Sequence, residues 1–445
     1  MRTVTVVGAS LAGLYAARAL RAEGFDGRLV IVGAEPHRPY DRPPLSKTFL
    51  TQRGPDAMGL TELRLSDREE EDGLDAEWHL GTRATALDTA GRTVTLDDGR
   101  TTRALRTDGL VIATGATPRT LPGPPLTGVH VLRTYDDARA LRAALHDGTP
   151  RVVVIGGGFI GAEAASSCAA LGLEVTVVEA APLPLVPQLG PDLARICVGL
   201  HADHGVRLLC GTGVKGLRDD GSGRVRAVEL ADGRLLDADL VIVGIGVRPA
   251  TDWLTGSGLR LDDGVGCDAG GVTSVPQVVA AGDVARCAGV RTEHWTSATE
   301  QPGTAVRNLL AGTTVARHTA PPYFWSDQYG TRIQLVGRRG PQDTVRIVEG
   351  DPGDRSFLAV YERDGRITAA LAVDRPRPFM RLRRRLVADA AAPCGPPAAP
   401  AAAPGAGAWP YCSAASGPRC AAPTPGASPR RPAPPTSRPP CSRPY

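Results

Sequence analysis

A glycine-rich loop near the start of the chain has the composition of a dinucleotide-binding turn. It follows a β-branched run and opens a segment with helical periodicity, and Glu35 stands 22 positions after Gly13. Glycine permits a tight turn, a helix N-terminus presents free N–H groups to a pyrophosphate, and the acid accepts hydrogen bonds from ribose hydroxyls. Ser10 replaces the usual middle glycine, and an ordinary strand–turn–helix remains an alternative for this loop alone. The loop residues are Gly8, Ser10, Leu11, Ala12 and Gly13.

A second loop carries all three glycines, and Glu179 follows Gly161 by 18 positions at the end of the next apolar run. This acid would accept from a free 2′-hydroxyl and repel a 2′-phosphate, and residues 180–182 supply no arginine to hold one. We therefore expect NADH to be preferred over NADPH. The loop residues are Gly156, Gly158, Phe159, Ile160 and Gly161.

The elements around the two loops repeat. Strands over 3–7 and 29–32 enclose a helix over 11–21, and strands over 151–155 and 174–178 enclose a helix that ends near 170. Each unit is followed by hairpin strands and a returning strand that ends in small residues. Two dinucleotide folds in one chain predict a flavoprotein in which one dinucleotide is a bound flavin and the other a diffusing nicotinamide.

The predicted fold is α/β, with two Rossmann-like domains, a C-terminal α+β domain and a disordered tail. The FAD-binding domain is placed at 1–112 and 241–312, and the NAD(H)-binding domain at 113–240. Alternating apolar residues over 331–336, 345–348, 357–361 and 367–373 predict an antiparallel sheet within a third domain at 313–390. Residues 391–445 hold 16 of the 39 prolines, which predicts disorder.

Lysine usage singles out one residue. Only Lys47 and Lys215 are lysines among 51 basic residues. Where arginine has replaced lysine almost everywhere, a retained lysine is a candidate for a role that needs a compact ammonium group. Chance retention is the alternative explanation for Lys47.

At this level of detail the chain resembles the ferredoxin reductase family of FAD-dependent pyridine nucleotide oxidoreductases, which includes putidaredoxin reductase, rubredoxin reductase and the reductase components of Rieske dioxygenases. The resemblance covers residues 1 to about 385. Its segments are specific to the family when taken together, although no single segment is. They are the two glycine-rich loops, the second extended to Glu163, together with 40–47, 113–119, 281–283 and 323–328.

The resemblance implies roles for individual residues. Arg42 and Lys47 would lie along the flavin, and Glu163 would pair with Lys47 at the nicotinamide site, where both would serve catalysis. Asp283 would bind the ribityl chain. Trp295 and Trp325 would flank the isoalloxazine, with core packing as their alternative role. Further cofactor contacts are expected from the ends of the returning strands, at Ala113, Thr114, Gly115, Arg119 and Gly246.

The position of the cysteines bears on the electron acceptor. None of the nine precedes Cys168, whereas related disulfide reductases and peroxide-reducing enzymes need cysteine beside the flavin. Electrons would then leave the flavin directly. We expect transfer to a [2Fe-2S] ferredoxin that serves a cytochrome P450 or Rieske-type oxygenase, docked on arginines at 377–385 or 338–339. A nitrite reductase or quinone type of acceptor, or an NADH-responsive binding protein similar to apoptosis-inducing factor, are the alternatives.

Composition and charge limit the partners and the compartment that we expect. The five arginines of the tail account for the formal net charge of +4, because the rest of the chain has 46 basic and 47 acidic residues. This balance gives no case for nucleic-acid binding. Neither a disulfide framework nor a metal site is readable from the cysteine spacings, and the apolar runs are too short to span a membrane. We expect a cytoplasmic protein that is a monomer or weak homodimer.

Overall fold

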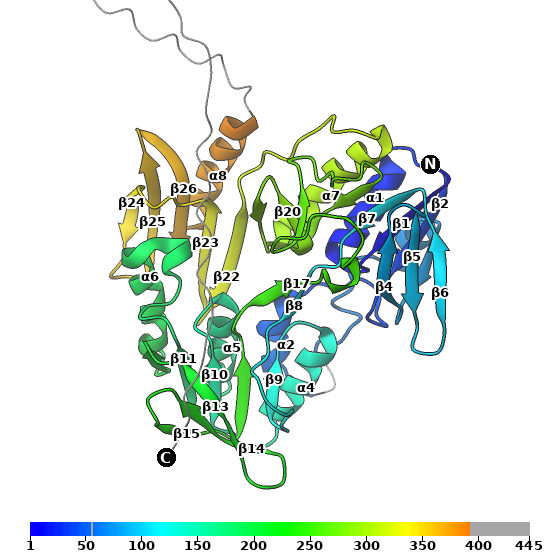
Figure 1. Cartoon of the computed structure of the whole chain (residues 1–445). Helices are drawn as coiled ribbons and strands as arrows, with labels where there is room; N and C mark the ends of the chain where they lie inside the picture. Colours follow the sequence, from blue (N-terminus) through cyan, green and yellow to red (C-terminus); the bar gives the residue numbers. More distant parts are fainter. Residues whose placement is uncertain (55–56, 392–445) are drawn as a thin grey trace, which may run out of the picture. The chain divides into compact units, whose positions relative to one another are not determined.

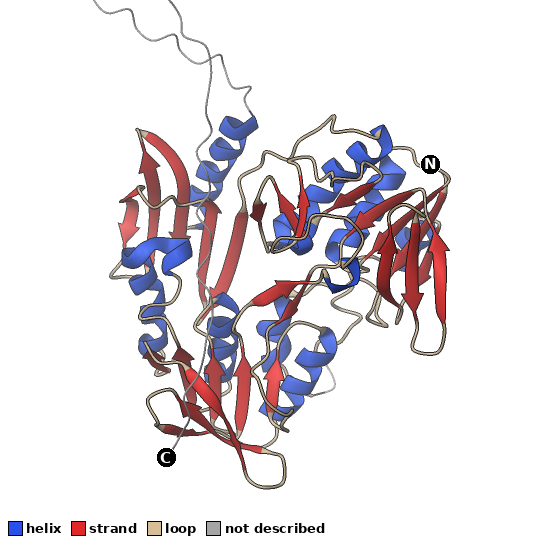
Figure 2. Ribbon diagram, viewed as in Figure 1, coloured by secondary structure: helices blue, strands red, loops and turns tan. Residues whose placement is uncertain are grey.

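The computed structural model describes residues 1–54 and 57–391 (Figure 1). From residue 392 onward, the predicted disordered tail lies outside the described residues. Figure 2 shows the helices and strands of these residues. Along the chain, helices are interspersed among the strands of the first two thirds, and a run of antiparallel strands follows. The predicted fold class is confirmed: two parallel sheets with Rossmann-like loops precede a C-terminal sheet domain.

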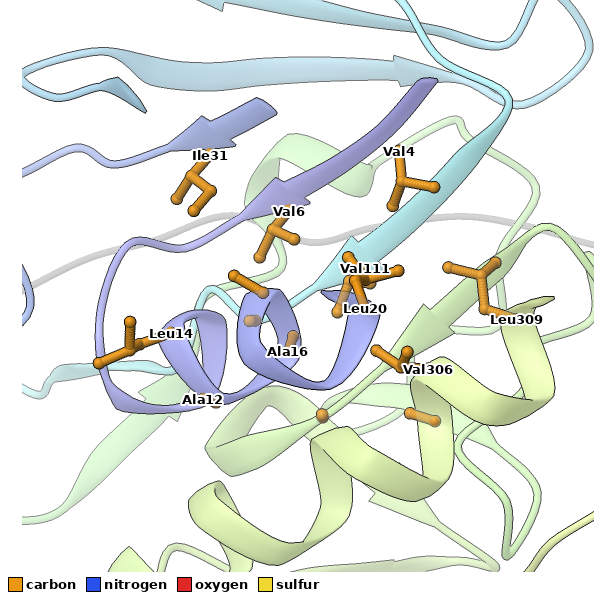
Figure 3. Packing of buried hydrophobic residues seen from close by; sticks show 14 of the residues in the cluster. Val4, Val6, Ala12, Leu14, Ala16, Leu20, Ile31, Val111, Val306 and Leu309 are labelled. Carbon is orange, nitrogen blue, oxygen red and sulfur yellow. The ribbon is translucent and has the colours of Figure 1, made fainter. Parts of the chain in front are cut away.

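The first sheet is wholly parallel, in the order β19-β7-β1-β2-β3. Its strands are β1 (Thr3–Val7), β2 (Arg28–Val32), β3 (Ala76–His79), β7 (Gly109–Ile112) and β19 (Val278–Ala280). Both faces must be covered in such a sheet. Helices α1 (Leu11–Ala22) and α7 (Trp295–Ala311) cover one face (Figure 3), where Leu14 and Leu309 share a buried hydrophobic cluster with Val4 and Val6 of β1.

The second sheet has the order β12-β11-β10-β16-β9 and is also parallel. Its strands are β9 (Val129–Val131), β10 (Val152–Ile155), β11 (Val175–Glu179), β12 (Arg207–Cys210) and β16 (Leu240–Val243). The domain boundary predicted at 240 is wrong in its position, because β16 pairs with β10 and β9 inside this sheet. The second nucleotide domain therefore extends at least through Val243.

The chain crosses between the two nucleotide domains twice, and the crossing segments pair with each other. Strand β8 (Ala116–Pro118) lies antiparallel to β17 (Val247–Pro249). Each domain also carries a three-stranded antiparallel meander, as the hairpin signals predict. These are β4 (Arg83–Asp88), β5 (Thr93–Asp97) and β6 (Thr102–Arg106), then β13 (Val214–Asp219), β14 (Val225–Leu230) and β15 (Leu235–Asp237).

The third domain is an antiparallel sheet in the order β22-β23-β26-β25-β24. Its strands are β22 (Tyr323–Gln328), β23 (Thr331–Gly337), β24 (Thr344–Asp351), β25 (Ser356–Arg363) and β26 (Arg366–Val373). Helix α8 (Pro376–Ala391) closes one face by burying Phe379 against Val336 and Val360. Helix α6 (Val186–Asp203) of the second nucleotide domain covers the other face, where Tyr361 donates a hydrogen bond to the Leu189 carbonyl.

The remaining helices and a small sheet complete the elements of the described residues. The helices are η1 (Pro43–Ser46), α2 (Thr48–Thr51), α3 (Arg68–Gly73), α4 (Tyr135–Leu145), α5 (Phe159–Ala170), α6 (Val186–Asp203), η2 (Asp252–Leu254) and η3 (Gly282–Val284). A small sheet contains β18 (Val265–Cys267), β20 (Ala285–Cys287) and β21 (Val290–Arg291).

Candidate active site

A cavity of 1210 Å³ lies where the three domains meet. Its volume exceeds the roughly 300–1,000 Å³ of an ordinary small-molecule pocket, so it is large enough for an extended dinucleotide. Most of the predicted site residues line it: Gly8, Ser10, Leu11, Ala12, Glu35, Arg42, Lys47, Ala113, Thr114, Gly115, Gly158, Phe159, Ile160, Glu163, Gly246, Asp283, Trp295 and Trp325.

The first glycine-rich loop forms one end of this cavity. Gly8 has φ +120°, and a Cβ there would stand 2.1 Å from the Ala113 carbonyl oxygen. A Cβ on Gly13 would stand 1.8 Å from the Gly8 carbonyl oxygen, so α1 can approach β1 only because this side chain is absent. The N-cap Ser10 makes no side-chain hydrogen bond to the first turn of α1. The free N–H groups of that turn therefore remain available to an anion.

Glu35 is held at the edge of the first sheet by two side chains. Its carboxylate accepts a hydrogen bond from the Tyr40 hydroxyl at 2.5 Å and forms an ion pair with the Arg42 guanidinium at 2.7 Å. Burial raises the pKa of Tyr40 well above its usual range, so the hydroxyl keeps its proton and stays a donor. Arg42 also donates to the Arg133 carbonyl oxygen at 2.5 Å. The acid of the first loop is thus fixed in place by a network.

Glu163 is the most densely bonded acid in the cavity, and only 3% of it is exposed. One carboxylate oxygen accepts from Lys47 Nζ at 2.8 Å and from Ser46 Oγ at 2.5 Å. The other accepts from Ser326 Oγ at 2.7 Å. Glu163 belongs to α5, Lys47 follows η1, and Ser326 lies on β22, so all three domains contribute to this cluster. A buried ion pair of this kind needs such additional donors to offset its desolvation.

The far side of the cavity holds Asp283 and the two tryptophans. Asp283, on η3, makes a 2.9 Å ion pair with Arg133. Trp295 donates from Nε1 to Asp41 at 2.8 Å, and its ring meets the Trp325 ring edge to face at a centroid distance of 6.0 Å. Burial raises the pKa of Asp41, and the indole hydrogen bond opposes that rise.

The second glycine-rich loop repeats the backbone geometry of the first. Gly156 has φ +106°, and its Cβ would stand 2.3 Å from the Gly244 carbonyl oxygen, while a Cβ on Gly161 would stand 2.0 Å from the Gly156 carbonyl oxygen. Glu179 accepts hydrogen bonds from the backbone N–H groups of Gly157 and Ala181, both at 2.8 Å. Unlike the Glu35 carboxylate, the Glu179 carboxylate has only backbone N–H partners among the described residues.

The remaining predicted residues do not line the cavity. Gly13, Gly156 and Gly161 act through the close helix–strand approach just described, and Glu179 stands beside the second loop. Arg119 directly follows β8 and is exposed. Its backbone N–H donates to the Gly246 carbonyl, and its Nε donates to the Val247 carbonyl at 3.3 Å. Its observed contacts join the crossing segments.

Several site residues were not predicted from the sequence. Ser46 and Ser326 lie inside segments that carry the resemblance, so the neighbouring Lys47 and Trp325 could have pointed to them. Tyr40 and Asp41 lie in the first of those segments as well. No sequence motif marks Arg133, because its ion pair with Asp283 joins residues 150 positions apart.

The donors and acceptors of the cavity fit a dinucleotide such as FAD. Two helix N-termini without side-chain caps open into the cavity, the Glu35 carboxylate lines it, and aromatic rings supply a stacking surface. The glycine contacts show that the backbone at Gly8 leaves no room for a side chain.

Comparison with protein families agrees with this geometry. Residues 2–302 match the model of the pyridine nucleotide-disulphide oxidoreductases. The chain belongs to this family. Residues 323–403 match the reductase C-terminal domain, and the last part of that match, 392–403, lies outside the described residues.

Individual members of the family cover nearly the whole chain. The ferredoxin–NAD(P)+ reductase of a Sphingomonas species is 38% identical over 87% of this chain and 93% of its own length. The ferredoxin reductase component of chlorobenzene dioxygenase from Cupriavidus sp. (strain PS12) is 40% identical, again over 87% of this chain and 93% of the relative. The solved covalent complex of putidaredoxin reductase with putidaredoxin is 33% identical, with a TM-score of 0.80 over 87% of this chain and 93% of that chain.

Among residues 1–54 and 57–391, no helix is both long enough and apolar enough to cross a bilayer.

Proposed function

We propose that this protein is an NADH-dependent flavoprotein reductase that passes electrons through FAD to a [2Fe-2S] ferredoxin serving a cytochrome P450 or Rieske-type oxygenase. The observation that carries the proposal is the Glu163 cluster. It stands between the two nucleotide loops and draws a hydrogen-bond donor from each of the other two domains. Such a group can orient a nicotinamide against a flavin without taking part in bond making.

Bound FAD would supply the redox chemistry, because a flavin accepts a hydride and can return its electrons singly. The residues that would hold it are those of the first loop with Glu35, and Asp283 on the opposite side. Lys47 would lie along the ring system, and the Trp295 and Trp325 rings would stack or abut it. The protein's contribution is alignment, because hydride transfer from a positioned nicotinamide needs no general base.

NADH would bind across the second loop. The uncapped N-terminus of α5 would receive its pyrophosphate, and Glu179 would receive a ribose hydroxyl. A 2′-phosphate there would face the Glu179 carboxylate, which supports the preference for NADH over NADPH.

Electrons would leave without a cysteine relay. No cysteine is among the described residues that line the cavity, and the sequence has none before Cys168. Relatives in dioxygenase systems are named ferredoxin reductases, and one solved neighbour is a complex with a putidaredoxin. These names support a one-electron iron–sulfur acceptor over a quinone or nitrite-reducing partner, and over an NADH-responsive binding protein.

Exposed arginines on α8 offer a docking surface for an acidic ferredoxin. Arg377, Arg381, Arg384 and Arg385 are exposed, whereas Arg383 lies 4.2 Å above the Tyr323 ring. Arg338 and Arg339 instead line the cavity itself. We place the docking surface on α8, with charge steering as its main effect on association.

We also propose that the reductase works in the cytoplasm, where NADH is supplied, as a monomer or weak homodimer.

The function is tested by ferredoxin-dependent cytochrome c reduction with NADH, using a [2Fe-2S] ferredoxin of a dioxygenase system. We expect rapid reduction only when ferredoxin is present. The double substitution Arg384→Glu and Arg385→Glu should raise the ferredoxin KM several-fold at low salt and leave NADH-ferricyanide activity unchanged. Arg226→Glu, an exposed position on β14, is the matched control. A rate that does not depend on ferredoxin would contradict the proposal.

A further inference from the structure

The small sheet beside the first nucleotide domain brings together two cysteines that the sequence separates. Cys267 ends β18 and Cys287 ends β20, and the two are register partners in parallel pairing. Their Sγ atoms stand 3.4 Å apart in a thiol–thiol contact. Among the described cysteines, no other pair has its sulfur atoms in contact.

The backbone geometry suits a covalent link. Neighbouring strands lie about 4.8 Å apart, and disulfides join residues whose Cα atoms are roughly 4.4–6.8 Å apart. Register partners on adjacent strands also direct their side chains to the same face of the sheet. The sulfurs therefore need only a small side-chain movement to bond, with no shift of the strands.

Both thiols are also within reach of a small oxidant. Cys267 and Cys287 are half-buried, whereas Cys168 and Cys197 are fully buried in the cores of other regions. The hydrogen bond from the Cys267 thiol lowers the pKa of Cys287 and raises that of Cys267 itself. This asymmetry makes Cys287 the better nucleophile of the pair, because the thiolate is the reactive form.

We propose that Cys267 and Cys287 form an oxidisable pair, a modification site that closes to a disulfide on reaction with a hydroperoxide. The Cys287 thiolate attacks a peroxide oxygen, the O–O bond breaks, and water or alcohol leaves as a sulfenic acid forms. The Cys267 thiol then attacks that sulfur, the S–O bond breaks, and a second molecule of water leaves. Each sulfur gives one electron to the peroxide, and a dithiol reverses the change.

The location of the pair gives the link a structural consequence. Strand β20 follows η3 directly, and η3 carries Asp283; the chain then turns through β21 to Trp295. Strands β18 and β20 are only three residues long each, so few backbone hydrogen bonds hold them. A disulfide would restrain this segment, and with it two residues of the cavity wall.

Peptide mapping of the full-length holoprotein tests the proposal. After treatment with hydrogen peroxide, free thiols are alkylated and the protein is digested with trypsin without reduction. Cleavage after Arg286 separates the two cysteines, so we expect peptides 261–286 and 287–291 to be joined, with the loss of two hydrogens, and to part on addition of dithiothreitol. Cys267→Ser should abolish the joined species, and Cys210→Ser, at another half-buried cysteine, should leave it intact.

Thermal unfolding adds a second readout. The oxidised wild-type protein should melt a few degrees higher than the reduced protein, and oxidised Cys267→Ser should show no such rise. Singly oxidised Cys267 and Cys287 without a link, or links from either residue to another cysteine, would overturn the proposal. A correct link with no change in melting would overturn its restraint of the cavity wall.

Discussion

The two nucleotide loops have nearly the same backbone and different surroundings. Gly8 and Gly156 have φ values of +120° and +106°, and both come too close to a carbonyl oxygen to carry a Cβ. Around Glu35, however, Tyr40 and Arg42 form a side-chain network that anchors the acid, whereas the Glu179 carboxylate accepts only from the backbone N–H groups of Gly157 and Ala181 among the described residues. This difference in anchoring supports the proposal that the first loop holds a retained cofactor and the second loop an exchanging co-substrate.

Glycine substitutions at the two loops should have the largest effects on cofactor binding. Gly8→Ala places a Cβ 2.1 Å from the Ala113 carbonyl, so we expect the purified protein to lose its flavin absorbance. Gly156→Ala should keep the flavin bands and weaken NADH binding at least tenfold, because the equivalent clash falls at the second loop. Absorbance spectra and NADH titrations measure both effects.

Surface glycines provide the controls for these two variants. Gly24 and Gly172 also have positive φ, yet a Cβ at either position meets no atom within 4 Å. Alanine at these sites should cost stability through backbone strain and leave both cofactors bound. Loss of flavin in Gly156→Ala with retention in Gly8→Ala would reverse the assignment of the two loops.

The junction of the two sites should show the next largest effect. Glu163→Gln leaves the Lys47 ammonium beside a neutral amide, and breaking a buried pair costs roughly 3–5 kcal/mol. We expect flavin reduction by NADH to slow on the order of 100-fold in stopped-flow measurements, while flavin binding persists. The double variant Lys47→Met, Glu163→Gln should recover part of the loss, because no charge is left unpaired. An unchanged rate in Glu163→Gln would remove this cluster from the nicotinamide site.

Replacing Glu179, the acid that follows the second loop, should show which loop binds the nicotinamide dinucleotide. Glu179→Ala removes the carboxylate that would repel a 2′-phosphate, so the ratio of NADPH to NADH efficiency should rise about tenfold. Glu35→Ala, its counterpart in the first loop, should leave that ratio unchanged and weaken flavin retention. The two efficiencies come from steady-state kinetics with each nucleotide. A change in the ratio from Glu35→Ala alone would place the nicotinamide in the other loop.

The smallest expected effect lies at Ser326, which reaches the site from the third domain. Ser326→Ala removes one neutral donor from Glu163 and leaves Ser46 and Lys47 in place. A hydrogen bond of this kind contributes about 1 kcal/mol, so we expect roughly a fivefold loss in kcat/KM for NADH. Ser326→Thr, which keeps the hydroxyl, should restore most of it. No loss in the alanine variant would show that the third domain does not position Glu163.

Most of the fold could be predicted from local sequence signals. The apolar runs that end at Gly8 and Gly156 gave the central strands of both sheets, because glycine loops and period patterns are properties of neighbouring residues. The domain boundary at 240 was placed wrongly, since hydrophobicity alone does not tell which sheet Leu240–Val243 joins. Strand β22 lay in a recognised segment, but its pairing with β23 could be known only in three dimensions.

The site residues likewise fall into those that local sequence signals reveal and those that only the folded chain reveals. The loop glycines, the two acids, Lys47 and Glu163 were accessible from the sequence through spacing or resemblance, and their cofactor roles stay predictions. The ion pair of Arg133 with Asp283, 150 positions away, and the contact of Cys267 with Cys287 depend on segments that only the folded chain brings together. No composition or spacing rule could have found them.

The central claim is that one loop retains a flavin and the other receives NADH. An anaerobic titration of the full-length protein with NADH, and separately with NADPH, tests it most directly. The account predicts oxidised-flavin bands that bleach at far lower NADH than NADPH concentration. A colourless protein that cannot be reconstituted with FAD, or bands that NADH leaves unchanged, would contradict it.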